Sequence, residues 1–281
     1  MDRRKGIIFA AAAALIWSTG GVFIKLVDAP GIYIAAGRSL VAGLFFLPFV
    51  RPRKLKWSKE LVLLILCYAY TLIGFVMATK LTTAANAIIL QYTTPIWLYI
   101  FYSFKKKSFD RRKMIPVILV AAGIIIFLFE PNSGTNIIGN MLALSSGISF
   151  AGVAHLSAMD HGATGPGLIS MINLATFLLA LPFVGGIAET TMSLDLMGII
   201  GILFLGAFQI GVGYIFYIKS LKNISPLDTS LICLIEPLMN PIWVLIFIHE
   251  IPTAFAMAGA ILVLAGIIAN IFSERFRFRS D

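Results

Sequence analysis

The chain has 281 residues, of which 59% are hydrophobic and 12% are charged, and its mean hydropathy is +0.94. Soluble domains are about 45 to 50% apolar and about 25% charged, so this composition excludes a soluble globular protein and requires lipid as the solvent. The net charge of +9 is no sign of nucleic-acid binding, because the basic residues lie in short gaps between apolar runs and do not gather on a polar face.

Ten apolar runs are predicted to be transmembrane helices, since a helix needs about 20 apolar residues to cross a hydrocarbon layer ~30 Å thick. The first run follows Arg3, Arg4 and Lys5 as a secretory signal would, but its length and the runs after it favour a retained helix. A β-barrel is excluded because its strands would alternate in polarity over ~10 residues. The predicted helices are 6–27, 31–50, 60–79, 82–104, 113–130, 138–158, 165–188, 196–218, 227–248 and 252–273.

The basic residues predict the orientation of these helices. Of the 22 Lys and Arg residues, 19 fall in segments that ten helices would place on one side of the membrane: the start of the chain, 51–59, 105–113, 219–222 and the tail. Short loops that are rich in Lys and Arg stay in the cytoplasm. We therefore expect a multi-pass protein of the cytoplasmic membrane with its N- and C-termini in the cytoplasm.

The polar, helix-breaking stretch 130–135 divides the chain nearly in half, with five predicted helices on each side. Because five is odd, two similar halves would have opposite orientations in the bilayer, which is the inverted-repeat plan of many secondary transporters. We expect the two repeats at 1–133 and 134–281.

The register between the halves stays open at this point. A shift of 142 residues places Lys80 and Pro95 over Lys222 and Pro237, whereas a shift of 146 places Pro95 over Pro241. Both shifts pair the fourth predicted helix with the ninth.

Three short motifs occur in order along the chain: Trp17-Ser18 in the first predicted helix, Arg38 followed by Ala42 in the second, and Glu236-Pro237 in the ninth, after Lys222-x-x-Ser225. With these motifs the chain resembles the drug/metabolite transporter superfamily, EamA type, over nearly its whole length. The resemblance implies ten helices in two fused five-helix repeats, cytoplasmic termini, a central cavity between the halves, and transport of amino acids, other metabolites or amphiphilic drugs. The seventh predicted helix has no Arg that answers Arg38.

Arg38 and Glu236 are expected near the middle of the bilayer, about eight residues into the second helix and about ten into the ninth. A charge there costs about 2.5 to 3.5 kcal/mol, so each side chain must face protein or water. Arg38 is expected either to bind a substrate carboxylate or to pair permanently with Glu236. The sequence leaves both open.

Polar residues at helical spacing predict a cavity around these charges, because lipid offers no hydrogen bonds. Close helix packing would equally explain the amides, and snorkelling to the outer interface would explain Lys25. The aromatic members of the set would suit a cation or an aromatic group. The predicted substrate-binding set is Trp17, Ser18, Lys25, Arg38, Gln91, Tyr92, Gln209, Tyr214, Glu236 and Asn240.

Prolines in the ninth helix predict a gate. Pro237 and Pro241 lack the N–H that would bond the carbonyl four residues earlier, and broken backbone beside a buried carboxylate suits a moving gate as well as a static kink. The start of this helix is predicted from Ser225, Pro226 and Asp228 as cap, first-turn proline and first-turn acid.

The predicted function is a secondary transporter that moves a small metabolite across the cytoplasmic membrane by alternating access. An amino acid or a related small carboxylate is favoured as the substrate, and export is one direction that we consider. An exporter of amphiphilic organic cations is the alternative, because Glu236 with aromatic neighbours would suit a cation. Whether the protein is a monomer or a homodimer stays open.

An intramembrane enzyme is not expected. The segment Gly147-Ile148-Ser149-Phe150-Ala151 misses the final glycine of a nucleophile elbow, and the sequence has no phosphate-binding loop. Cys67 and Cys233 lie apart in apolar runs, without the spacing of a metal site or a disulfide framework. We expect no cofactor and no metal, and the expected partners are the substrate and the lipid bilayer.

Overall fold

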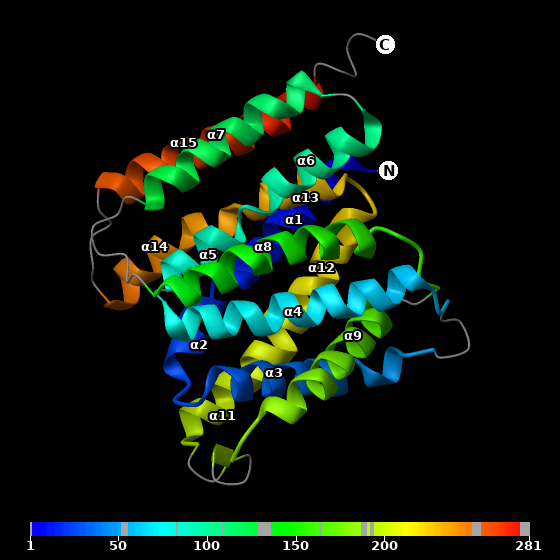
Figure 1. The fold of residues 1–281 in the computed structure, drawn as a ribbon, viewed down its shortest axis with the longest axis vertical. Helices are drawn as coiled ribbons and strands as arrows, with labels where there is room; N and C mark the ends of the chain where they lie inside the picture. The colour runs from blue at the N-terminus through cyan, green and yellow to red at the C-terminus, as the bar shows by residue number, and fades with distance from the viewer. Residues whose placement is uncertain are drawn as a thin grey trace.

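The computed structural model describes residues 2–51, 56–82, 84–107, 109–128, 136–162, 165–186, 190–191, 194–248 and 254–275. At 84–85, 240–241, 244–245, 247–248, 256 and 271–275 the description covers the backbone only. The described residues form helices and no strand (Figure 1). Among the described residues, five helical spans are long and apolar enough to cross a membrane: Arg3–Leu26, Lys59–Leu81, Ile137–Ser157, Gly165–Phe183 and Leu196–Leu221. The prediction of an all-α membrane architecture is confirmed at this level.

The helices follow the predicted runs in order. The first half contains α1 (Arg3–Trp17), α2 (Gly20–Leu26), α3 (Gly31–Phe45), the 3-10 turn η1 (Leu47–Phe49), α4 (Lys59–Leu81), α5 (Ala84–Gln91), α6 (Thr94–Lys106) and α7 (Arg111–Leu128). The second half contains α8 (Ile137–Ser157), α9 (Gly165–Ala180), the 3-10 turn η3 (Leu181–Phe183), α11 (Leu196–Leu203), the π-helical η4 (Phe204–Val212), α12 (Gly213–Leu221), α13 (Pro226–Cys233), α14 (Ile235–Ile248) and α15 (Ala254–Arg275).

Several predicted helices are interrupted or shorter than expected. Between α5 and α6 the helix breaks just before Pro95, which lacks an N–H for the Gln91 carbonyl, and the Thr94 hydroxyl donates to that carbonyl at 2.8 Å. The first predicted helix breaks after Ser18, whose hydroxyl donates to the Leu15 carbonyl at 2.7 Å. The second and seventh predicted helices end early, at Phe45 and Ala180, because prolines follow in η1 and η3.

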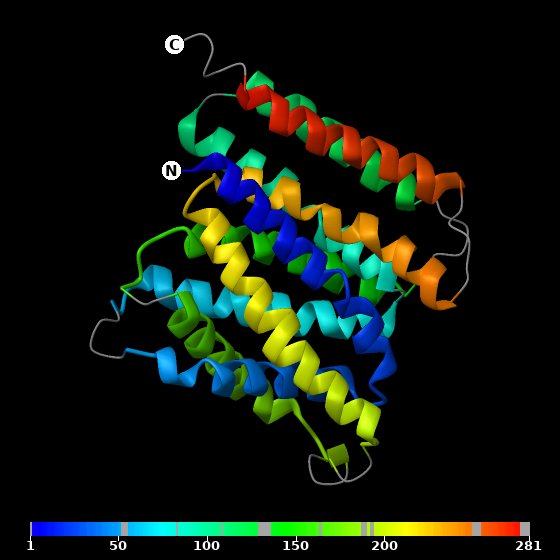
Figure 2. The same cartoon turned by 180° about the vertical axis from the view of Figure 1, so that it is seen from behind.

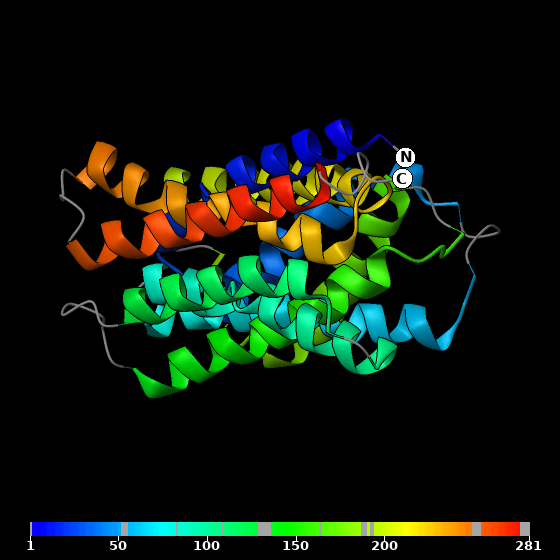
Figure 3. The ribbon, with the colours of Figure 1, turned by 90° about the horizontal axis from the view of Figure 1, so that it is seen from above.

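Basic segments of the sequence meet at one end of the bundle. The start of α1 and the end of α15 lie at the same end, together with the turns that join α3 to α4 and α8 to α9 (Figures 1 and 3). There Lys56 pairs with Asp160 at 2.5 Å and its backbone N–H donates to the His161 carbonyl at 3.0 Å. The described parts of the basic segments at the start of the chain and at 51–59 therefore lie at one end.

Helices from the two halves pack against each other. The main pairs are α7 with α15, α4 with α8, α3 with α9 and α1 with α12. Figure 1 shows α7 and α15 side by side along one edge of the molecule, and Figure 2 shows α1 crossing beside α12 on the opposite face. Each of these pairs joins one helix of the first half to one helix of the second.

Contacts between the halves recur at matching positions. A Cβ added to Gly123 in α7 would lie 2.7 Å from Val263 and 2.8 Å from the Gly259 carbonyl, and one added to Gly266 in α15 would lie 2.8 Å from Val120 and 3.0 Å from the Pro116 carbonyl. Each residue of the first contact maps onto the second by a shift of 143. Such reciprocal contacts are those of two helices related by a two-fold axis.

The helix bounds favour the shift of 142 over that of 146. The eight-residue helices α5 and α13 begin at 84 and 226 and end at 91 and 233. The tetrapeptide Leu-Pro-Phe-Val occurs twice, at 47–50 and 181–184, and begins with η1 and η3. Its two copies lie 134 residues apart, so they pair the ends of the second and seventh predicted helices without deciding between the shifts of 142 and 146. The sequence analysis did not use this repeat, although it was visible there.

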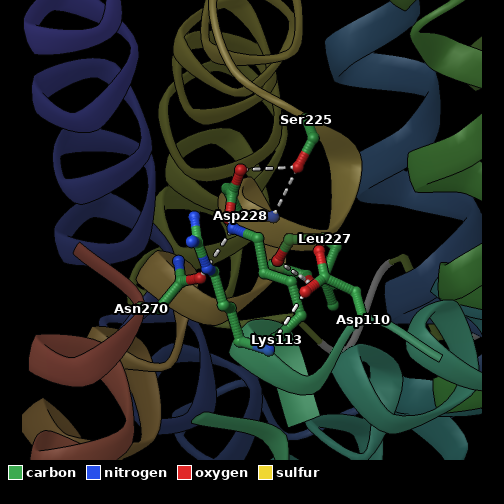
Figure 4. A network of polar contacts seen from close by, with 8 residues as sticks. Asp110, Lys113, Ser225, Leu227, Asp228 and Asn270 are labelled. Atoms are coloured by element: carbon green, nitrogen blue, oxygen red, sulfur yellow. Dashed lines mark hydrogen bonds and ion pairs between the residues drawn. The ribbon is translucent and has the colours of Figure 1, made fainter. Parts of the chain in front are cut away.

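A buried ion pair joins three helices at the basic end of the bundle (Figure 4). The Lys113 ammonium at the start of α7 bonds the Asp228 carboxylate of α13, and it donates to Asn270 of α15 at 3.1 Å. Ser225 accepts from the Asp228 N–H at 3.1 Å, so the predicted cap of this helix is confirmed. Lys113, which the sequence analysis counted only as an orientation signal, holds α7 and α15 to α13.

We predict that Gly123→Ala lowers the melting temperature of the purified protein in detergent. The new methyl group would overlap Val263 and the Gly259 carbonyl, and overpacking of this kind costs about 1 to 3 kcal/mol, more than the ~1 kcal/mol that Ala gains over Gly in a helix. Gly185→Ala is the control, because its added methyl group has no atom within 4 Å. A Gly123→Ala protein that melts with the wild type would contradict the close α7–α15 contact.

Candidate functional site

A small cavity lies where helices of both halves meet. Its volume is about 40 Å³, roughly the space of one water molecule, whereas pockets for drug-sized ligands are about 300 to 1,000 Å³. In this conformation the cavity is therefore too small for a metabolite. The cavity is lined by Trp17, Arg38, Thr71, Leu72, Phe75, Gln91, Tyr92, Phe150, Gln209, Ile210, Tyr214 and Glu236.

Arg38 brings a buried positive charge to this cavity from α3. Its side chain is 1% exposed, and Nη2 donates to the Leu72 carbonyl of α4 at 3.2 Å. Nε has no hydrogen-bond partner among the described residues. A guanidinium has five N–H donors, so most of its capacity is left for a ligand or water.

Glu236 brings a buried carboxyl group to the same cavity from the start of α14. Its Oε2 accepts a hydrogen bond from the Tyr92 hydroxyl, which lies at the break between α5 and α6. Within the described residues, no Arg38 nitrogen lies within 4.0 Å of a Glu236 oxygen. Arg38 and Glu236 therefore line one cavity without an ion pair between them.

Two more cavity residues have buried polar atoms without a partner among the described residues. They are the hydroxyl of Thr71 in α4 and Oε1 of Gln209 in η4. An unsatisfied buried polar group costs about 1 to 3 kcal/mol, so such atoms are expected to bond water or a ligand. The π-helix that holds Gln209 is a rare element that is often found at functional sites.

Aromatic rings form the remaining wall of the cavity. The Trp17 ring lies 5.9 Å from Phe150 and 4.8 Å from Tyr214, centroid to centroid. Trp17 fits here because Gly213 has no side chain: a Cβ at that position would lie 2.3 Å from the indole nitrogen. The walls therefore suit an apolar or aromatic group, and the polar groups above suit charged ends.

The structure brings seven of the ten predicted binding residues together: Trp17, Arg38, Gln91, Tyr92, Gln209, Tyr214 and Glu236. Ser18 does not line the cavity, and its hydroxyl accepts from the Trp243 indole at 2.9 Å. Lys25 lies at the end of α2 and donates to the Thr82 carbonyl at 3.0 Å. The side chain of Asn240 lies outside the described residues.

Of the two predicted gating prolines, the structure describes the side chain of Pro237 only. Pro237 is the third residue of α14, just after the break at Leu234, so its missing N–H would lack an intrahelical acceptor in any case. The side chain of Pro241 lies outside the described residues. The sequence analysis placed Glu236 inside one long helix, but the structure places it at the start of a second one.

Five cavity residues were missed in the sequence: Thr71, Leu72, Phe75, Phe150 and Ile210. Thr71 was the one signal available, as a hydroxyl in the apolar middle of its predicted helix. In a uniformly apolar helix the other four do not stand out from lipid-facing residues. The described residues contain no cluster of three His, Cys, Asp or Glu side chains that could hold a metal ion.

Comparison with known proteins gives consistent matches over nearly the whole chain. The EamA-like transporter family matches residues 4–129 and 137–272. A Salmonella typhimurium protein named "Probable amino-acid metabolite efflux pump" is 22% identical over 99% of this chain and 98% of its own length, and the Escherichia coli protein of the same name is 21% identical over the same shares. An Archaeoglobus fulgidus protein named "Uncharacterized transporter" is 24% identical over 92% of this chain and 95% of its own.

The fold has also been seen before. One crystal structure superposes on this chain with a TM-score of 0.76 at 14% identity, covering 96% of this chain and 98% of the other. At this identity the likeness concerns the fold alone.

We predict that the Tyr92–Glu236 hydrogen bond stabilises the closed cavity. Tyr92→Phe removes the donor to a buried carboxylate and should lower the free energy of unfolding by about 1 to 3 kcal/mol. In a double-mutant cycle with Glu236→Gln, measured by denaturant unfolding in detergent, the two losses should couple by more than ~0.5 kcal/mol. Tyr99→Phe, which removes an exposed hydroxyl 3.4 Å from the Asp110 carbonyl, is the control. Additive losses would mean that the bond is absent in solution.

Proposed function

Because this chain belongs to the EamA-like transporter family, we propose that it is a secondary transporter that binds a small zwitterion, an amino acid or a close relative, between Arg38 and Glu236. The observation that carries this proposal is that Arg38 and Glu236 line one cavity without an ion pair between them. A carboxylate on the substrate would accept hydrogen bonds from Arg38, and an ammonium group would donate hydrogen bonds to Glu236. A ligand with both groups satisfies both charges at once.

Because Arg38 and Glu236 are buried, the site should favour a substrate with two charged ends over one with a single charged end. Taking an ion out of water costs several kcal/mol, and this cost is recovered only when a counter-charge and hydrogen bonds are supplied. A substrate that lacks one of its two charged ends would leave either Arg38 or Glu236 unpaired in the closed site. A related small carboxylate is then the weaker ligand of the same class.

Two inverted repeats would supply the movement. Three observations support a division into 1–133 and 134–281, with ten membrane helices in all. They are the reciprocal contacts of Gly123 and Gly266, the equal lengths of α5 and α13, and the repeated tetrapeptide. The broken helices of both halves meet at the Tyr92–Glu236 bond. In alternating access the halves rock about such a site, and the closed cavity of about 40 Å³ must widen for the substrate to enter.

The proposed location is the cytoplasmic membrane. The proposed orientation places the basic end of the bundle on the cytoplasmic side. The positions of the termini and the Lys56 and Lys113 segments at one end support it. Export is the proposed direction, which rests on the names of the Salmonella and Escherichia relatives.

An exporter of organic cations is the second candidate. The bond between Tyr92 and Glu236 and the ring wall of Trp17 and Tyr214 favour it, because carboxylates and aromatic faces bind ammonium groups. In that case Arg38 would lie in the site without a role in binding. The two candidates therefore differ in what happens when Arg38 is removed.

We predict that an amino acid stabilises the purified protein and so raises its melting temperature. The gain in the free energy of unfolding grows with concentration and reaches ~2.7 kcal/mol at 100 times the dissociation constant. The best ligand from a screen is then compared with two analogues, the amine without the carboxylate and the acid without the amine. In Arg38→Ala the amino acid should stabilise the protein no more than the amine does. In Glu236→Gln the amino acid should stabilise it no more than the acid does.

The same ligand should exchange across proteoliposomes that contain the wild-type protein. If only organic cations stabilise the protein, and Arg38→Ala binds them as well as the wild type does, the second candidate replaces the first. If no solute stabilises or exchanges, both candidates fail.

A further inference from the structure

Helix α9 lines no part of the cavity, yet one of its side chains reaches the surroundings of Arg38. The Asn173 amide nitrogen donates to the Tyr68 hydroxyl of α4 at 2.9 Å and to the Ile169 carbonyl at 2.8 Å. Asn173 and Tyr68 are both 0% exposed. A buried polar pair between two membrane helices needs a reason, since apolar packing would hold them as well.

Asn173 fixes the direction of this hydrogen bond. A carbonyl only accepts, so the contact with Ile169 identifies the atom as the NH₂ group, and that group also meets Tyr68. The Tyr68 oxygen therefore accepts from Asn173, and its own O–H is left to donate elsewhere. The Asn173 Oδ1 atom has no partner among the described residues.

Tyr68 lies next to the groups that would hold the substrate carboxylate. It is one helical turn before Leu72, whose carbonyl accepts from Arg38, so the two residues share a face of α4. Its ring meets that of Tyr214 edge-on at 4.9 Å, and its hydroxyl interacts electrostatically with both Arg38 and Tyr214. Tyr214 lines the cavity.

We propose that Tyr68 and Asn173 are positioning residues, which aim Arg38 and Tyr214 at the carboxylate of the substrate. A long arginine side chain loses about 2 kcal/mol of rotamer entropy when it is fixed, so a site that fixes it in advance binds more tightly. The inference rests on the proposed function. It gives α9, which has no arginine of its own, a part in binding the anionic end of the ligand.

The test uses Tyr68→Phe, which keeps the ring and removes only the hydroxyl. The dissociation constant is measured by thermal shift for the amino acid found above and for the matching amine without the carboxylate. We expect affinity for the amino acid to fall about tenfold, while affinity for the amine stays within about twofold. Asn173→Ala should give the same selective loss, and the double variant should lose no more than either single one.

Tyr70→Phe is the matched control. It lies on the same helix, and its hydroxyl bonds Ser145 of α8 at 2.8 Å, outside the cavity. It should change neither affinity.

A purely structural role for Tyr68 would weaken both ligands equally or change only the melting temperature without ligand, and either result overturns the inference. The proposed function would fail separately, since then the wild type would bind no amino acid.

Discussion

A bilayer offers no hydrogen bonds to a charged side chain, and the centre of this protein is organised around that constraint. Arg38 and Glu236 lie deep in the bundle, and each is held by one neighbour, a carbonyl of α4 and the hydroxyl of Tyr92. The rest of their capacity faces a common cavity. The transporter proposal follows from this incomplete pairing, because a fully paired site would have nothing to offer a solute.

The breaks in the helices depend on the same constraint. A proline inside a membrane helix leaves a carbonyl without its donor, and lipid cannot replace it. At Pro95 the chain supplies the Thr94 hydroxyl, whose single proton is shared between the Gln91 carbonyl at 2.8 Å and the Gly147 carbonyl of α8 at 3.0 Å. The break between α5 and α6 is therefore satisfied within the protein, and it places Tyr92 where it meets Glu236.

Much of this arrangement could be predicted from the sequence, and the reasons for the misses are physical. Hydropathy located the helices, and isolated polar residues such as Arg38, Gln209 and Glu236 stood out against an apolar background. Leu72 and Phe150 could not stand out, because apolar residues look alike whether they face lipid or a cavity. Tyr68 and Asn173 are linked only through packing between α4 and α9, which one sequence does not reveal.

The small volume of the cavity also bears on how a solute would cross the protein. A hollow of about 40 Å³ holds roughly one water molecule, and the rings of Trp17, Phe150 and Tyr214 stand around it. This space is far smaller than the about 300 to 1,000 Å³ of pockets that hold small molecules. In the proposed transporter, these rings must therefore move apart before a solute can pass from one end of the bundle to the other.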